Sequence, residues 1–228
     1  MNRSIAFALC MLTTTLLVGC ANAPGRRAID EENVAPHKIV AFNVLYRTNC
    51  AGCHGADGQG GAALALANPI YLAIADADVL RRVTADGIAG TPMPAFARRS
   101  GGMLTDQQID AIVNGIRTRW ANQSAVAAID LPLPPYSDPL PGDVRRGRAV
   151  FRFYCASCHG DEGRGARGGG SIVDGSYLAL VSDQGVRTTV IAGRPDLGAP
   201  DWRGNVRGKA MTSQNISDVV AWLSAQRP

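Results

Sequence analysis

Apolar residues recur at helical spacing in three stretches of each half of the chain. The pattern predicts helices at about 38–49, 76–87 and 105–120, and again at about 144–154, 182–192 and 212–226. Asp76 and Thr105 stand at two of the predicted starts and are of residue types that cap helices, and "TDQQ" resembles a capping box. No stretch alternates convincingly between apolar and polar residues, so the pattern predicts an all-α fold.

The two sets of predicted helices belong to two copies of one unit. The matching residues are Cys50 with Cys155, Tyr71 with Tyr177, and Ile109 with Ile216, at offsets of 105, 106 and 107 positions. Such a slow drift of the offset indicates a duplication with short loop insertions. Each copy has roughly 90 residues, and a unit of this size often needs a further group to complete its core.

A proline-rich stretch separates the two copies. Residues 129–142, "IDLPLPPYSDPLPG", hold five prolines, which excludes a helix and favours a semi-rigid extended linker. We therefore predict one domain at 37–128 and a second at 143–228. The polar stretch 20–36 has no apolar period and is predicted to be a flexible tether.

The first 19 residues have the pattern of an export signal. Arg3 precedes an apolar run from Ile5 to Val18, which is too short to span a bilayer comfortably. The run is followed by a cysteine, Cys20. One interpretation is a plain signal peptide that is cut at Ala21 or at Ala23, with Cys20 incidental.

The end of this segment also resembles a known processing site. "LVGC" is similar to the lipobox of bacterial lipoprotein precursors. The resemblance implies a lipoprotein signal peptide at 1–19 and a lipidated Cys20, whose acyl chains would anchor the protein stably to a membrane. It also implies a position on the periplasmic side of a bacterial membrane. Ala21 after the cysteine favours the outer membrane.

The composition is that of a soluble globular protein. Hydrophobic residues make up 46% of the 228 residues and charged residues 18%. The net charge of +4 is small and evenly spread. These values argue against a nucleic-acid partner.

Two Cys-x-x-Cys-His motifs carry the candidate chemistry: Cys50, Cys53 and His54 in the first copy, and Cys155, Cys158 and His159 in the second. Two thiols at this spacing can add to the two vinyl groups of haem, and the following imidazole then reaches the iron. A thioredoxin-like pair expects a βαβ context, which the pattern lacks, and one shared zinc site would leave a histidine unexplained. The motifs therefore predict two haem c groups.

The motifs and their surroundings resemble the cytochrome c family, in the diheme form with two tandem class I domains. Besides the motifs, the resemblance rests on "GIAGTPMPAF" and on the closing helices "DQQIDAIVNGIRTRW" and "SQNISDVVAWLSAQRP", and it covers 37–128 and 143–228. In that family a Met after the middle helix supplies the sixth iron ligand, and Met93 matches its position. The resemblance implies His/Met ligation of haem 1, which raises its potential.

The second copy departs from the family pattern. Met93 stands six residues after Gly87, whereas Ala199 stands six residues after Gly193. A methyl group cannot bind iron, so haem 2 is predicted to lack the family's loop Met and to have the lower potential or an accessible iron.

Few side chains remain to replace the missing ligand. Met211 is the nearest in sequence, but it aligns with Leu104 directly before a helix start, where an apolar residue usually packs. The other candidates are Met103, His37, Lys38 and Lys209. Failing these, the iron is five-coordinate or binds water.

The predicted function is the transfer of single electrons by an anchored diheme cytochrome. Its partners would be a redox donor and acceptor, or a respiratory complex of which it is a subunit. No nucleophile–base pair or carboxylate dyad indicates a separate active site. The alternative is a haem enzyme, or a site that reacts with peroxide or a small gas, at an open haem 2.

Overall fold

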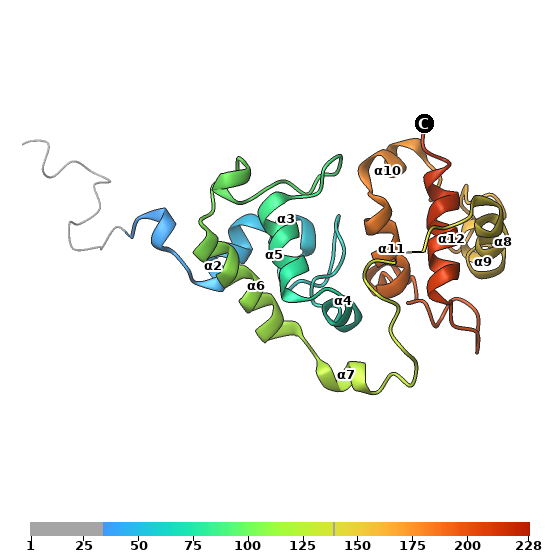
Figure 1. The fold of residues 1–228 in the computed structure, drawn as a ribbon, viewed down its shortest axis with the longest axis horizontal. Coiled ribbons are helices and arrows are strands. Elements are labelled where there is room, and N and C mark those ends of the chain that lie inside the picture. The colour runs from blue at the N-terminus through green and yellow to red at the C-terminus, as the bar shows by residue number, and fades with distance from the viewer. Residues whose placement is uncertain (1–33, 139) are drawn as a thin grey trace, which may run out of the picture. The chain divides into compact units, whose positions relative to one another are not determined.

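The described chain is built of helices in two matching series (Figure 1). The first is α2 (Phe42–Asn49), α3 (Ala51–His54), α4 (Pro69–Ile74), α5 (Ala77–Asp86) and α6 (Asp106–Trp120), followed by α7 (Gln123–Ala127). The second is α8 (Val144–Tyr154), α9 (Ala156–His159), α10 (Gly175–Leu180), α11 (Asp183–Ala192) and α12 (Ser213–Ser224). Single 3₁₀ turns occur at Pro36–Lys38 (η1), Arg98–Ser100 (η2) and Pro195–Leu197 (η3).

The structure, a computed structural model, describes residues 34–138 and 140–228. Within these residues only isolated β-bridges accompany the helices, so the predicted all-α class is confirmed. Residues 39–228 form one compact unit. The predicted signal peptide at 1–19, the proposed lipidation residue Cys20 and most of the predicted tether lie outside the described residues.

The predicted helix starts agree with side-chain caps in the structure. Asp76 accepts a hydrogen bond from the Val79 N–H, and Thr105 forms a complete capping box with Gln108. The first helix begins at Phe42 and not near 38, and the Ile39 carbonyl that precedes it accepts a hydrogen bond from Gln108 Nε2 at 2.9 Å. This contact holds Ile39 against α6.

The short helices α4 and α10 are absent from the sequence prediction. Each has six residues, too few for an apolar period to appear. Their starts carry a capping signal nevertheless: the Asn68 and Asp174 side chains each accept hydrogen bonds from two backbone N–H groups of the first turn.

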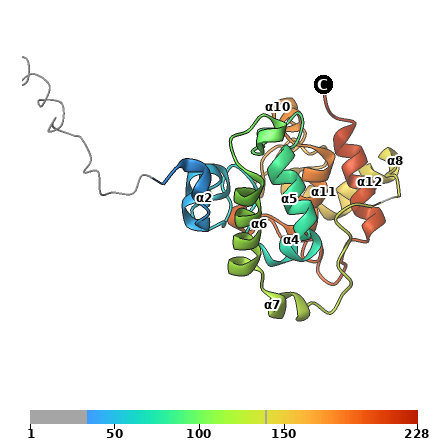
Figure 2. The same cartoon turned by 60° about the vertical axis from the view of Figure 1, so that its left-hand side comes forward.

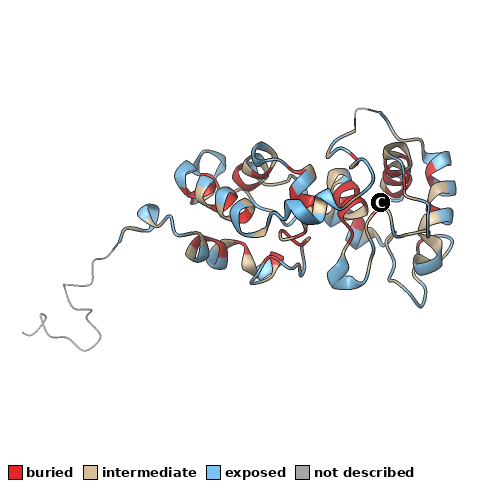
Figure 3. Cartoon of the chain, turned by 90° about the horizontal axis from the view of Figure 1, so that it is seen from below, coloured by how far each residue is buried: buried red, intermediate tan, exposed pale blue. Residues whose placement is uncertain are grey.

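Helices pack in the same pairs in both halves. Within the first half α5 packs against α6, and within the second α11 packs against α12, as both views show (Figure 2). Each half has helices with a buried face: the buried residues of α6 include Ile109, Ile112 and Ile116, and buried and exposed residues alternate along the helices in Figure 3, in red and pale blue. Ile109 and Ile112 in α6, and Phe151 and Trp202 in the second half, are at most 1% exposed.

Helix α8 crosses α12 at a glycine. A Cβ on Gly147 would lie 2.0 Å from the carbonyl oxygen of Asp218 and 2.7 Å from Cβ of Trp222. Any side chain here would separate the two helices. The ring of Phe151 then lies 4.4 Å from that of Trp222, centroid to centroid.

The described residues of the proline-rich stretch, 129–138 and 140–142, contain no helix, as predicted, but the stretch is fixed to the second half. The Arg187 guanidinium of α11 donates hydrogen bonds to the carbonyls of Pro135 and Tyr136 at 3.0–3.2 Å. Gln184 adds a hydrogen bond to the Tyr136 carbonyl at 2.8 Å. Asp138 accepts a hydrogen bond from Ser213 at the start of α12. The stretch is therefore a strap on α11 and α12.

Candidate functional site

The first motif lies on one helical turn at the junction of α2 and α3. The Cys50 carbonyl accepts hydrogen bonds from the N–H groups of Cys53 and His54, at 3.2 and 3.0 Å. Cys50 and His54 are buried, and Cys53 is exposed. The turn thus brings both thiols and the imidazole of the first motif together.

The His54 ring is oriented by a backbone carbonyl. Its Nδ1 lies 2.8 Å from the Leu64 oxygen, an arrangement in which Nδ1–H donates and Nε2 carries the lone pair. Burial lowers the pKa of His54 below its ordinary value; the Leu64 contact opposes this, and the positive charge of Arg194 adds to it. A neutral, oriented imidazole is what a metal ligand requires.

The second motif repeats this geometry. The Cys155 carbonyl accepts from the His159 N–H at 3.0 Å, and His159 Nδ1 lies 2.8 Å from the Gly170 oxygen. The glycine-rich loop lies directly on the ring, since a Cβ on Gly169 would come within 2.9 Å of Nδ1. This glycine-rich loop therefore covers the candidate iron ligand.

The Cys50 and Cys155 thiols are unlike those of a thiolate catalyst. Burial and, second, the neighbouring thiol raise the pKa of Cys50 to about 11, and the same causes raise the pKa of Cys155 to about 12. Catalytic and redox-active thiols show the opposite shift. All four cysteines are free in the described residues, and no three His, Cys, Asp or Glu side chains there are grouped as metal ligands.

The loops after α5 and α11 have the same backbone geometry. The Ile88 N–H donates to the Met93 carbonyl at 3.0 Å, and the Arg194 N–H donates to the Ala199 carbonyl at 3.0 Å. Gly87 and Gly193, with φ of +69° and +71°, pack on the prolines that follow these residues. Met93 and Ala199 thus hold equivalent positions. Met93 is half-buried, and its role as an iron ligand stays a prediction.

Met211 occupies the position of Leu104, as the alignment predicts. Its N–H donates to the Trp202 carbonyl at 3.0 Å, and the Leu104 N–H donates to the Phe96 carbonyl at 2.8 Å. Met211 is 3% exposed and belongs to the hydrophobic core, and its sulfur lies 3.9 Å from Asn205 Nδ2. Its role as ligand of haem 2 stays a prediction.

The other substitute ligands lie on the surface. Met103 is 81% exposed, and His37 and Lys38 are exposed residues of η1. The Lys209 ammonium lies 5.2 Å from the centre of the Phe153 ring.

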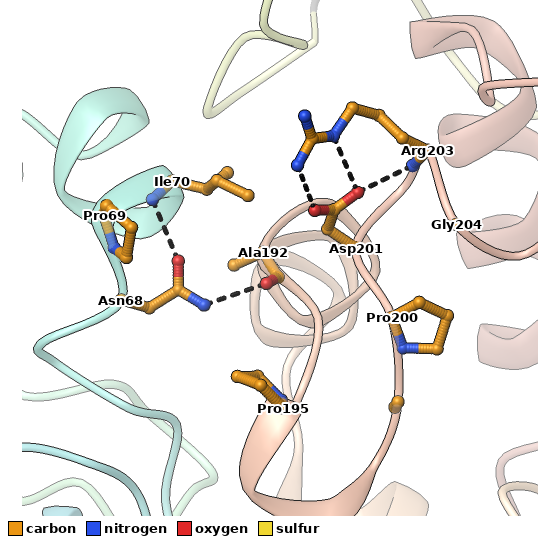
Figure 4. A pocket seen from close by; sticks show the side chains of 10 residues that line it. Asn68, Pro69, Ile70, Ala192, Pro195, Pro200, Asp201, Arg203 and Gly204 are labelled. Carbon is orange, nitrogen blue, oxygen red and sulfur yellow. Dashed lines mark hydrogen bonds and ion pairs between the residues drawn. The ribbon is translucent and has the colours of Figure 1, made fainter. Parts of the chain in front are cut away.

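A cavity of about 530 Å³ lies beside the loop that lacks the Met (Figure 4). Its walls come from α4 on one side and from the loop around Ala199 on the other. Asn68 Nδ2 donates to the Ala192 carbonyl at 2.9 Å across this boundary, and Arg203 pairs with Asp201 on the cavity wall, as the dashed lines in Figure 4 show.

A second contact joins the halves at the first motif. Arg194 Nη2 donates to the Gly61 carbonyl at 2.7 Å. The contacts of Asn68 and Arg194 could not be predicted from the sequence, because no pattern in either half indicates which residue of the other half a side chain will meet. Only the cap signal of Asn68 could have been read from the chain.

These residues fit haem c. Each motif presents two unpaired thiols and an imidazole whose Nδ1 is engaged, which leaves Nε2 for iron. The family model described as "Cytochrome C oxidase, cbb3-type, subunit III" matches residues 39–114 and 142–223. The chain belongs to this family of c-type cytochromes. Each matched segment carries one motif, and the cofactors are two haem c groups.

Named relatives of the cytochrome come from respiratory complexes. A "Cytochrome bc1 complex cytochrome c subunit" of Mycobacterium tuberculosis (strain ATCC 25618 / H37Rv) is 30% identical over 183 residues, which cover 78% of this chain and 60% of the relative. A "Cbb3-type cytochrome c oxidase subunit CcoP" of Azospirillum sp. (strain B510) is 33% identical over 141 residues, 57% of this chain and 41% of the relative. The chain thus spans 60% or less of the length of these relatives.

One solved structure is also similar to the cytochrome. It is the "Kuenenia stuttgartiensis reducing HAO-like protein complex Kustc0457/Kustc0458", with a TM-score of 0.44, 16% identity, and coverage of 82% of this chain and 96% of that chain.

Among residues 34–138 and 140–228, no helix has the length and hydropathy to span a bilayer.

Proposed function

We propose that this cytochrome transfers single electrons through two unequal haem sites. Haem 1 would be held by Cys50, Cys53 and His54, and haem 2 by Cys155, Cys158 and His159. The observation that carries this proposal is the repeated motif geometry, with both Nδ1 atoms 2.8 Å from a carbonyl oxygen of the loop that follows. When bound, haem c supplies one-electron redox chemistry, while the chain attaches it, orients the imidazole and limits the access of water.

The inequality of the sites rests on the ligand loops. Met93 would complete the ligation of haem 1, and its thioether favours ferrous iron and a higher potential. Ala199 holds the equivalent position in the second half, as the matching backbone hydrogen bonds support. Haem 2 would then have the lower potential or an accessible iron, unless Met211 leaves its core position to bind.

The proposal is tested by haem content and variants of the two motifs. We expect intact-mass spectra to show two haem adducts on the wild-type protein, and one adduct after Cys50→Ser/Cys53→Ser or after Cys155→Ser/Cys158→Ser. Each variant controls for the other. The absence of adducts in a host competent for cytochrome maturation would contradict the proposal.

A ligand-accessible haem 2 is a second candidate function, favoured by the cavity next to Ala199. Arg203 on its wall would supply a polar group toward a small ligand. We expect carbon monoxide to change the spectrum of the reduced protein at one haem, and rapid turnover of peroxide would indicate a haem enzyme. A reduced protein with two low-spin haems and no response to carbon monoxide would contradict the open site.

The position in the cell is part of the proposal. We infer a lipid anchor at Cys20 after removal of residues 1–19, and a periplasmic location on the membrane, with the outer membrane preferred. Labelled fatty acid should enter the wild-type protein and not Cys20→Ala. Labelling of both proteins would contradict the anchor.

The relatives' names support a place in a respiratory complex. Those relatives are subunits of a bc1 complex and of a cbb3-type oxidase. We therefore propose that the protein exchanges electrons with a redox partner of such a complex. Solubilisation in mild detergent should keep the complex together, and a cytochrome that migrates only at its own mass would contradict subunit status.

We also propose the predicted domain organisation, with domains at 37–128 and 143–228 joined by residues 129–142. The repeated helix order supports this division. Separate expression of the two segments tests it, since each is expected to take up one haem.

A further inference from the structure

An ion pair of the second half lies on the loop that follows the first motif in the chain. Arg194 Nε and Nη2 pair with the Asp196 carboxylate at 2.9 and 2.7 Å, and Nη2 also donates to the Gly61 carbonyl at 2.7 Å. The two side chains are only 15% and 20% exposed. The charges are therefore poorly screened by water.

The loop that contacts this ion pair is joined to the first motif by backbone hydrogen bonds. The Gly60 N–H donates to the His54 carbonyl at 2.9 Å, and the Ala63 N–H donates to the Cys53 carbonyl at 2.9 Å. A Cβ on Gly60, whose φ is +104°, would come 2.7 Å from Asp196 Oδ2. Both charges thus lie against the segment that fixes His54.

The ion pair is specific to the second half. By the equivalence of the two ligand loops, Ile88 holds the position of Arg194, and Gly90 holds that of Asp196. The loop of the second half, which lacks the Met, therefore carries two charged residues where the loop of the first half has uncharged ones. Its tip contacts the other half of the molecule.

We propose that Arg194 is a positioning residue that joins the two halves at the first haem motif and raises the reduction potential of haem 1, while Asp196 limits this effect. The inference rests on the proposed function. A positive charge near a redox centre favours the state with one more electron, and a negative charge disfavours it. The buried Asn68–Ala192 hydrogen bond, at 2.9 Å, holds the same boundary and keeps the ion pair in place.

The test compares two substitutions that each remove one charge and keep a polar side chain. In spectroelectrochemical titrations of the holoprotein, Arg194→Gln is expected to lower the potential of haem 1 and Asp196→Asn to raise it. Arg194→Lys keeps the charge and should leave the potential close to that of the wild type. A loss of structure would move the potential of both variants in one direction, so opposite signs separate charge from damage.

Arg99→Gln is the matched control. Arg99 also pairs with a carboxylate of its own half, Asp86, at 3.0 Å, but it is 50% exposed. Its substitution should leave both potentials unchanged. The titration wave of haem 1 is identified as the one that Met93→His displaces.

The outcomes distinguish the inference from the function on which it rests. If the protein holds two haems and Met93→His displaces a wave, but Arg194→Gln and Asp196→Asn shift it in the same direction or not at all, the inference is wrong. If haem is absent, or Met93→His displaces no wave, the proposed ligation of haem 1 fails and takes the inference with it. Opposite shifts with an inert control support both.

Discussion

Loss of the Arg187 guanidinium is expected to release the strap between the two halves. In the structure this group is 6% exposed and donates to the carbonyls of Pro135 and Tyr136 and to the hydroxyls of Ser213 and Ser217. Its Nη2 also lies 3.6 Å from the Asp138 carboxylate, which is 7% exposed. Arg187→Met keeps much of the side-chain volume but removes every one of these donors.

The loss of stability in Arg187→Met follows from the buried groups that Arg187 contacts and that the substitution leaves behind. Removing one member of a buried ion pair costs about 3–5 kcal/mol, because the other charge is left without compensation. Two carbonyls also lose a donor, although the strap can move and expose them to water. We therefore expect Arg187→Met to lower the free energy of unfolding by about 3–5 kcal/mol. With an m-value of about 2 kcal/mol/M, this is a fall of about 1.5–2.5 M in the urea midpoint.

Urea denaturation of the holoprotein, followed by circular dichroism, measures this change. Arg148→Met is the control, because Arg148 pairs with Glu162 on the surface, with side chains 55% and 53% exposed, and such a pair contributes about 0–1 kcal/mol. Limited proteolysis should cut the strap only in Arg187→Met. Equal urea midpoints for the two variants would refute the reasoning.

Three further changes have defined outcomes. Gly147→Ala should lower the free energy of unfolding by about 1–3 kcal/mol or more, because its Cβ meets the Asp218 carbonyl at 2.0 Å; an unchanged thermal midpoint would contradict this close crossing. The hydrogen bond from Ser213 holds the pKa of Asp138 below its ordinary value, so its contribution to stability is present above the unfolded-state pKa of about 3.9 and is lost as the pH falls through the folded-state pKa. The free energy of unfolding should therefore fall less steeply with decreasing pH below about pH 4 in Asp138→Asn than in the wild type, and equal slopes would count against this contribution of Asp138. Ala199→Met should supply haem 2 with the loop ligand, raise its potential and abolish the carbon monoxide response; a persistent response would show that this loop does not face the iron.

The main helices could be predicted because their apolar periods and caps are local properties of the chain. Asp76 and Thr105 mark starts that the structure confirms. The motif turns were also visible, since Cys-x-x-Cys-His needs only one turn of helix. The repeat then located the loops after α5 and α11, and their backbone hydrogen bonds agree with that alignment.

Contacts between distant segments could not be predicted in this way. The linker composition predicted the lack of helix that its described residues show, but nothing in it indicated that Arg187 would bind the carbonyls of Pro135 and Tyr136. Arg194 likewise looked like one surface arginine among many, and only the fold brings it to Gly61. Such contacts depend on how distant segments pack against one another. This packing produces no periodic pattern of residues in either segment.

The proposed function depends on two c-type haems with unequal iron ligation. Spectroelectrochemical titration of the purified holoprotein, with and without carbon monoxide, tests it most directly. We expect two one-electron waves, of which only the lower-potential wave responds to carbon monoxide. Two waves that are both insensitive to carbon monoxide, or the absence of any haem wave, would contradict the account.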